Sequence, residues 1–96
     1  TATREFGGPA LIRALAIQPD DKLLVAGEFS QISGGHGAPQ ARNRIARINT
    51  DGSIDATFIP DLGFSPIFDL LSTESGRIFV SGSKVQELSP IDGASL

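Results

Sequence analysis

The chain has 96 residues, with eight Lys and Arg against eleven Asp and Glu, and a net charge of −3. This acidic balance argues against a nucleic-acid binder or an anionic-membrane binder, because both need a positive field. The sequence has no cysteine, which excludes disulfides and thiolate chemistry, and no apolar run approaches the ~20 residues of a membrane span. We therefore expect no nucleic-acid partner and no membrane insertion.

A first antiparallel hairpin is predicted near the start of the chain. Residues 11–17 are expected to form a strand, since the helical alternative is short and stops at Pro19. The alternation predicts one face with Leu11, Leu15 and Ile17 and the other with Ile12, Ala14 and Ala16. A turn at 19–22 leads into a second strand at 22–29, whose apolar run is typical of a strand covered on both sides. Gly27 inside it indicates a bulge or a close backbone approach.

The remainder of residues 10–59 completes a first repeat. Residues 30–41 are rich in glycine and are predicted to form a long surface loop. Residues 44–49 form a third predicted strand. Asp51 and Gly52 are a strong hairpin signal, and the alternation that follows predicts a fourth, half-buried strand at 54–58.

The pattern restarts after a connector at residues 60–66. Residues 67–72 match 12–17 and residues 77–82 match 22–27, both at an offset of 55 (67 − 12 = 55 and 77 − 22 = 55). Residues 85–88 match 45–48 at an offset of 40 (85 − 45 = 40). Only three residues follow Asp92 and Gly93, so the second repeat, 67–96, is expected to be truncated.

These two copies predict an all-β fold of two propeller-like blades. Each blade would be an antiparallel four-strand meander, the second one incomplete, and such repeats bury their faces by stacking on neighbours. The structural signature of the repeat consists of Pro19, Asp20, Lys22, Gly27, Asp51, Gly52, Gly76 and Gly82.

The N-terminal segment, residues 1–9, has a separate expectation. Residues 1–3 resemble residues 55–57 of the predicted fourth strand, so we expect residues 1–6 to supply a strand to another blade. Because the chain begins at Thr1 and contains no methionine, we expect it to be a processed product or, in preference, an excerpt of a longer protein.

Four motifs of the first copy point to a known repeat. They are Gln-Pro-Asp-Asp-Lys at 18–22, Val-Ala-Gly-Glu-Phe at 25–29, Arg-Ile-Ala-Arg-Ile-Asn at 44–49 and Asp-Gly-Ser-Ile-Asp-Ala-Thr-Phe at 51–58. In these motifs the sequence resembles the delta-60 repeat family, a β-propeller-like repeat of otherwise unassigned role. The resemblance implies large bacterial parent proteins that are exported or surface-associated, and it alone favours an extracellular location. It brings no catalytic residues.

Two sets of side chains are candidates for metal or acid–base sites. His36 is the only histidine and has no cysteine to join it, so we expect a solvated loop histidine. The acids at 20–21 and 51–55 lack the alternating oxygen donors and closing Glu of a calcium loop. They are better explained as turn carboxylates, and Asp55 as a structural group between strands.

Arg42, Arg44 and Arg47 follow the long loop and form the main candidate for ligand or partner contacts, together with His36. A phosphate or carboxylate could dock on such a cluster. We favour pairing of the arginines with acids of the chain, namely Glu28, Asp51 or Asp55.

The expected function is a non-enzymatic structural or interaction module without a cofactor. Two blades cannot close a ring, so their apolar faces need cover from other copies of the chain or from neighbouring blades of a parent chain. The alternative is a ligand-binding propeller for an acidic glycan or peptide, and an enzyme with a carboxylate site is the third and weakest interpretation.

Overall fold

The computed structural model describes residues 11–32, 40–60 and 67–96. Their regular elements are eight β-strands paired in antiparallel fashion, and this described part of the chain contains no helix, so the expected all-β class is confirmed. Within the same residues nothing helical is long and apolar enough to cross a bilayer. The predicted strand at 1–6 and nearly all of the connector lie outside the described residues.

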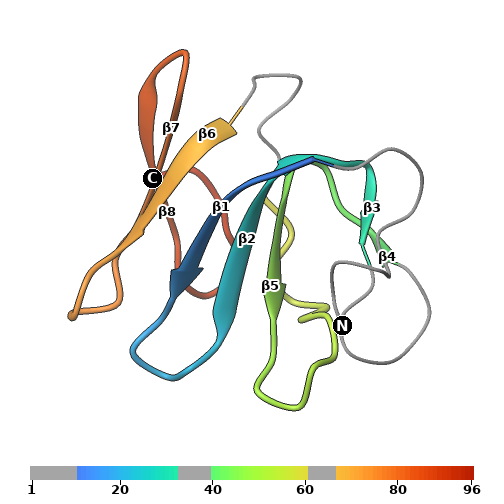
Figure 1. Ribbon diagram of the computed structural model, residues 1–96. Coiled ribbons are helices and arrows are strands. Elements are labelled where there is room, and N and C mark those ends of the chain that lie inside the picture. The colour runs from blue at the N-terminus through green and yellow to red at the C-terminus, as the bar shows by residue number, and fades with distance from the viewer. Residues whose placement is uncertain (1–10, 33–39, 61–66) are drawn as a thin grey trace.

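Two three-stranded sheets make up most of the molecule (Figure 1). The first has the order β1-β2-β5 and consists of β1 (Leu11–Ile17), β2 (Leu23–Glu28) and β5 (Ile45–Ile48). The second has the order β6-β7-β8 and consists of β6 (Ile67–Ser72), β7 (Ile78–Gly82) and β8 (Val85–Leu88). These strands coincide with the repeat derived from the sequence to within about a residue or two at each end.

The hydrogen bonds repeat along with the strands. In the first hairpin turn Asp21 N donates to Gln18 O at 2.9 Å, and in the second Gly76 N donates to Thr73 O at 2.9 Å. Asp21 has φ 68 and Gly76 has φ 90, so both turns need a left-handed residue at this point. Asp is one of the residues that adopts this conformation at modest cost, and this explains why it can stand where the second copy has glycine.

A bulge in β1 changes the predicted pattern of faces. The register with β2 shifts between Ile12 and Ala14, so that Ile12 packs on one side of the sheet and Ala14 and Ala16 on the other. The expectation that these three share one face was wrong, because simple alternation fails across a bulge. The bulge lies against Gly27, where a Cβ would sit 2.0 Å from the carbonyl oxygen of Leu11, so the close approach predicted there is confirmed.

The expected fourth strand at 54–58 is reduced to a single bridge between Ile48 and Ile54. The chain turns directly afterwards, because the side chain of Asp55 accepts the backbone N–H of Thr57 at 2.9 Å. The second copy has the matching single bridge, between Leu88 and Ser95. Among the described residues, each of the two main sheets therefore has three strands and one further bridge.

The predicted long loop has paired strands at its two ends, which were not expected. Residues 30–41 contain a short ribbon of β3 (Gln31–Ile32) and β4 (Gln40–Ala41), which Figure 1 shows on the side away from the second sheet. Ile32 is fully buried there against the first sheet. The ribbon is thus part of the fold and covers one face of the first blade.

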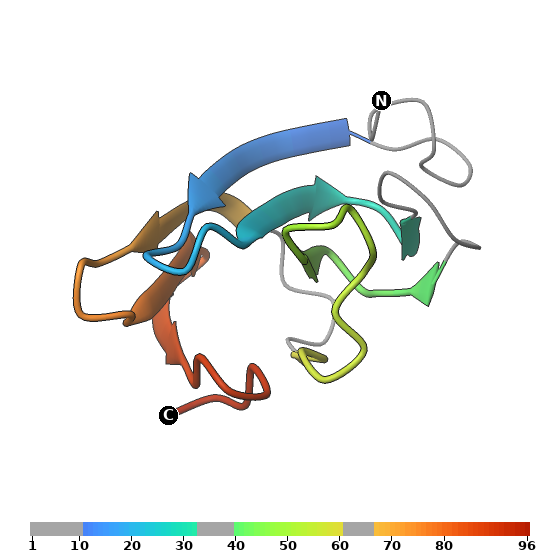
Figure 2. The ribbon, with the colours of Figure 1, turned by 90° about the horizontal axis from the view of Figure 1, so that it is seen from below.

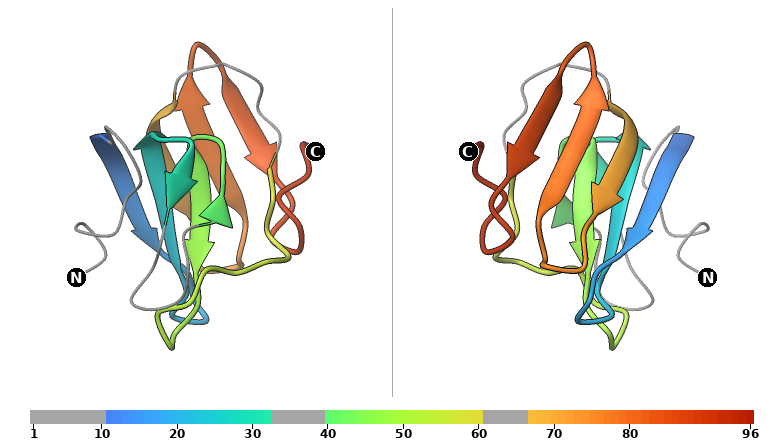
Figure 3. Two further views of the ribbon diagram at one scale, coloured as in Figure 1. Left: turned by 90° about the vertical axis from the view of Figure 1, so that its right-hand side faces the viewer. Right: turned by 90° about the vertical axis from the view of Figure 1, so that its left-hand side faces the viewer.

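The two sheets pack against each other as adjacent blades. Strands β1 and β2 contact β6, and the sheets fan out from the side where β1 and β6 lie together (Figure 2). The core between them joins Leu24, Ala26, Ile45 and Phe58 of the first repeat with Leu70, Ile78, Val80 and Leu88 of the second. Figure 3 shows the two sheets one in front of the other, with the first sheet nearer the viewer in the left view and the second sheet nearer in the right view. A second cluster lies on the opposite face of the first sheet, so β2 is covered on both sides as predicted.

Candidate functional site

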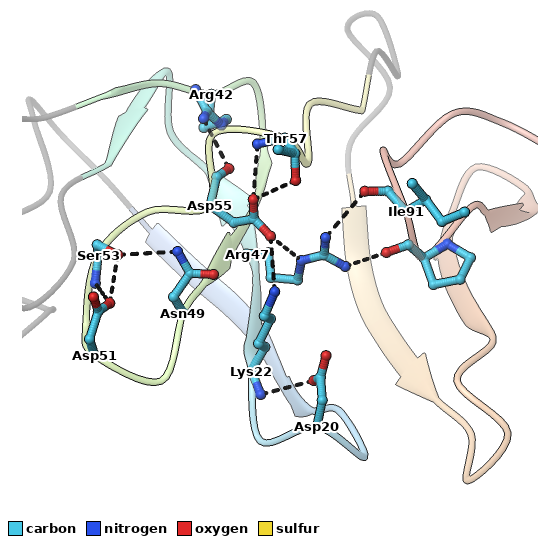
Figure 4. A network of polar contacts seen from close by, with 11 residues as sticks. Asp20, Lys22, Arg42, Arg47, Asn49, Asp51, Ser53, Asp55, Thr57 and Ile91 are labelled. Atoms are coloured by element: carbon cyan, nitrogen blue, oxygen red, sulfur yellow. Dashed lines mark hydrogen bonds and ion pairs between the residues drawn. The ribbon is translucent and has the colours of Figure 1, made fainter.

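Arg47 on β5 connects the two blades (Figure 4). Its Nε donates to Asp55 Oδ2 at 2.8 Å, and its terminal nitrogens donate to the carbonyl oxygens of Pro90 and Ile91 in the second repeat. The guanidinium lies 4.4 Å from the ring centroid of Phe58, close enough for a cation–π interaction. All three nitrogens are therefore used inside the protein, and the residue is only 5% exposed.

Asp55 is the centre of the same network. Its Oδ1 accepts from Thr57 N and Thr57 Oγ1, at 2.9 and 2.6 Å, and its Oδ2 lies 3.5 Å from Lys22 Nζ. Burial by itself raises the pKa of this carboxyl, but the hydrogen bonds from Thr57 and Arg47 and the charge of Arg47 outweigh it. The pKa of Asp55 falls from the usual 3.8 to about 2.

This arrangement is suited to holding strands and blades together. A carboxylate with a pKa of about 2 and several fixed donors is a weak base near neutral pH and has little capacity for proton transfer. The expected pairing of the arginine cluster with an acid is confirmed for Arg47 and Asp55. Glu28, another expected partner, pairs with Arg13 on the neighbouring strand β1.

The two other candidate arginines, which lie among the described residues, do not form an exposed site with Arg47. Arg42 is buried, and its terminal nitrogens donate to the carbonyl oxygens of Ala41 and Asp55. Arg44 is half-buried and has a left-handed backbone, with φ 72. His36 lies outside the described residues. The guanidinium groups of Arg42 and Arg47 are thus engaged inside the protein, which argues against an acidic ligand docking on this cluster.

The remaining signature residues form turns. Asp20 Oδ1 accepts from Lys22 N at 3.1 Å, and Asp51 Oδ1 accepts from Ser53 N at 2.9 Å. Gly52 has φ 92, as the hairpin after Asp51 requires. Pro19 begins the first turn, and Gly82 ends β7. The description of these acids as turn carboxylates is confirmed.

A hollow of about 270 Å³ lies between the hairpin turns of the two blades. Gln18, Asp20, Arg47 and Glu74 contribute polar groups to its wall. Gln18 is buried, and its Oε1 has no hydrogen-bond partner among the described residues, but the donors of Arg47 are already taken. The described residues nowhere bring three or more His, Cys, Asp or Glu together in a way that would hold a metal ion.

A second hollow, of about 180 Å³, lies on the outer face of the second sheet. We call this surface the open face, and it consists of Asp69, Leu71, Phe79, Ser81 and Val85. Val85 is 73% exposed and Leu71 is 58% exposed. This surface was not predicted from the sequence. A comparison of buried positions between the two copies would have found it, since the matching residues of the first sheet are apolar too.

Comparison with known proteins supports the propeller interpretation. Residues 18–58 match a family model described as a domain of unknown function (DUF5122) beta-propeller. No curated protein and no solved structure matches. The match does not carry the delta-60 name, which remains a resemblance seen in the sequence. Residues 18–58 are therefore similar to a β-propeller repeat family whose function has not been assigned.

Proposed function

We propose that the chain is a non-enzymatic structural and interaction module, a pair of propeller blades that acts by stacking on further blades. The partners would be other copies of the chain, or neighbouring repeats of a larger surface protein. The proposal rests chiefly on one observation, which is that the core between the two blades is built from residues of both. Leu24 and Ile45 of the first sheet are fully buried by residues of the second sheet.

The polar groups support a structural role over a catalytic one. The most strongly perturbed carboxyl, that of Asp55, is committed to Thr57, Arg47 and Lys22, and its pKa of about 2 holds it in the ionised form. Two of the three clustered arginines are occupied by internal acceptors. Charged side chains of the kind that an enzyme or an anion-binding site would use are here engaged in contacts within the protein. We call the contacts of Arg47 with Asp55 and with the carbonyls of Pro90 and Ile91 the joint between the blades.

Static light scattering of the purified chain over a wide concentration range tests this proposal. A module that stacks should show a mass above the 10.0 kDa of one chain, rising with concentration. A mass that stays at 10.0 kDa at every concentration would refute self-assembly. The readout does not depend on which surfaces make the contact.

A further inference from the structure

We propose that the open face is a docking surface for a second copy of this chain, which seats on it through the exposed side of β1 that carries Leu15 and Ile17. The contact joins the second blade of one copy to the first blade of the next, head to tail. This inference rests on the proposed function and adds the surface, the partner and the direction of assembly.

The open face matches a face of the first sheet that is already covered. At the repeat offsets of 55 and 40, Leu71, Phe79 and Val85 correspond to Ala16, Leu24 and Ile45 of the first sheet. Leu24 and Ile45 have no exposed surface, because the second sheet lies on them. The open face is therefore the same side of a blade, but no further blade covers it within the part of the chain that the structure describes.

The surface that would cover the open face is the corresponding side of a first sheet. The first sheet is covered by Leu70, Ile78 and Val80 of the second sheet. Their counterparts in the first sheet are Leu15, Leu23 and Val25. Leu70 is 8% exposed, whereas Leu15 is 61% exposed and the neighbouring Ile17 is 71% exposed. The two ends of the molecule thus expose the two halves of an interface that the middle of the molecule already contains.

This side of the first blade is partly covered within the chain and partly exposed. Val25 is 2% exposed and packs with Phe29 and Ile32 next to the ribbon of β3 and β4, so this side of β2 is already covered. On β1, none of the described residues provides such cover for Leu15 or Ile17, and both are more than half exposed. In the internal interface, β6 contacts both β1 and β2, and β6 is the strand of the second repeat that corresponds to β1. The β1 strand of a second copy would accordingly lie over β6 and β7, where the hollow is found.

The rim of the open face differs from the internal interface. Glu87 occupies the position of Arg47 and pairs with Arg77, which also lies 5.0 Å from the ring centroid of Phe79. Arg47 donates to two backbone carbonyls of the next blade, and a carboxylate has no hydrogen to donate to such groups. Docking on the open face would therefore depend mainly on apolar contact, so we expect a reversible assembly in preference to a permanent one.

Two charge substitutions separate the halves of this contact. Leu71→Glu disables the open face and Leu15→Glu disables the β1 side, and both positions are more than half exposed, so that neither change should unfold the chain. Ile59→Glu is the matched control, because Ile59 is 59% exposed and belongs to neither surface. Circular dichroism and urea unfolding establish that each variant is folded.

Sedimentation velocity then measures the mass of each variant and of an equimolar mixture. We expect Leu71→Glu and Leu15→Glu to be monomers, Ile59→Glu to assemble like the unaltered chain, and the mixture to form dimers. The mixture restores one contact, because each variant keeps the half that the other lacks.

Other outcomes would overturn the inference in distinguishable ways. If Leu15→Glu assembled normally while Leu71→Glu did not, the open faces would meet each other and the head-to-tail contact would be wrong. A monomeric mixture would exclude the contact as well. In both cases assembly of the unaltered chain would leave the proposed function standing, whereas a monomeric unaltered chain would remove both.

Discussion

Replacing Asp55 by Asn tests whether the joint between the blades depends on an ionised carboxylate. Asn has nearly the same shape and can still accept from Thr57 N, but it removes the negative charge that pairs with Arg47 and Lys22. The pKa of Asp55 is lowered from 3.8 to about 2 in the folded chain. A shift of this size corresponds to about 2 kcal/mol of folding free energy.

A second consequence of the substitution adds to this figure. Arg47 would keep its contacts with the carbonyls of Pro90 and Ile91 but would remain buried without a counter-charge. Removing one partner of a buried ion pair costs roughly 3–5 kcal/mol when nothing else compensates. Because the two carbonyls do compensate in part, we expect a loss of about 2–3 kcal/mol at pH 7.

Urea unfolding followed by circular dichroism measures this loss as a function of pH. The folded-state pKa lies below the unfolded-state value, so the stabilisation is present above pH 3.8 and disappears as the pH falls towards about 2. The difference between the unaltered chain and Asp55→Asn should accordingly be largest near neutral pH and close over this acidic range. Asp51→Asn is the control, since Asp51 caps a similar turn at an exposed position, and it should cost less than about 1 kcal/mol. Equal losses for the two variants, or a difference that does not change with pH, would refute the reasoning.

Two further predictions concern the joint and the bulge. Arg47→Met should cost about 3 kcal/mol because it leaves a buried carboxylate and two carbonyls without their donor, while Lys22→Met, at a partly exposed pair, should cost less than about 1 kcal/mol. Similar urea midpoints for these variants would contradict the assigned role of Arg47. Gly27→Ala should cost roughly 2–4 kcal/mol because its Cβ would collide with the backbone of Leu11. Gly76→Ala, with φ 90 and open space, should cost only about 1 kcal/mol, and the reverse order would show that the bulge can relax.

The strands were predictable from the sequence because the same apolar pattern occurs twice. A run such as that of β2, with Leu24 and Val25 on opposite faces, needs cover on both sides whatever its neighbours are. The offsets between the copies then fixed the pairing of strands. The internal comparison was thus a stronger guide than the propensity of any one segment.

Other features depend on contacts that a pattern does not contain. The alternation of Ile54, Ala56 and Phe58 predicted a strand, but the side chain of Asp55 offers the backbone a turn instead, through Thr57. The bulge in β1 arises where its backbone meets Gly27. Local hydrogen bonds and close backbone approaches of this kind can end or distort a strand even where the apolar alternation in the sequence continues.

The candidate site was only partly predictable for the same reason. The sequence pointed to the arginine cluster and to its pairing with an acid, which Arg47 and Asp55 confirm. It could not show that Arg47 donates to the carbonyls of Pro90 and Ile91, because every residue has a backbone carbonyl and the sequence does not show which of them accept from a side chain. The open face was missed because Leu71 and Val85 have the composition of core residues, and only the arrangement of blades decides whether such residues are covered.

Site-specific cross-linking tests the central claim most directly, and the absence of cysteine from the sequence makes it simple. Leu15→Cys and Leu71→Cys each carry a single thiol, one on each proposed surface, and a short bismaleimide joins thiols that come close together. We predict that cross-linked dimers form when the two variants are mixed and that neither variant forms them alone. Cross-linking of Leu71→Cys alone, or its absence from the mixture under conditions where the chains assemble, would contradict the head-to-tail stacking of blades.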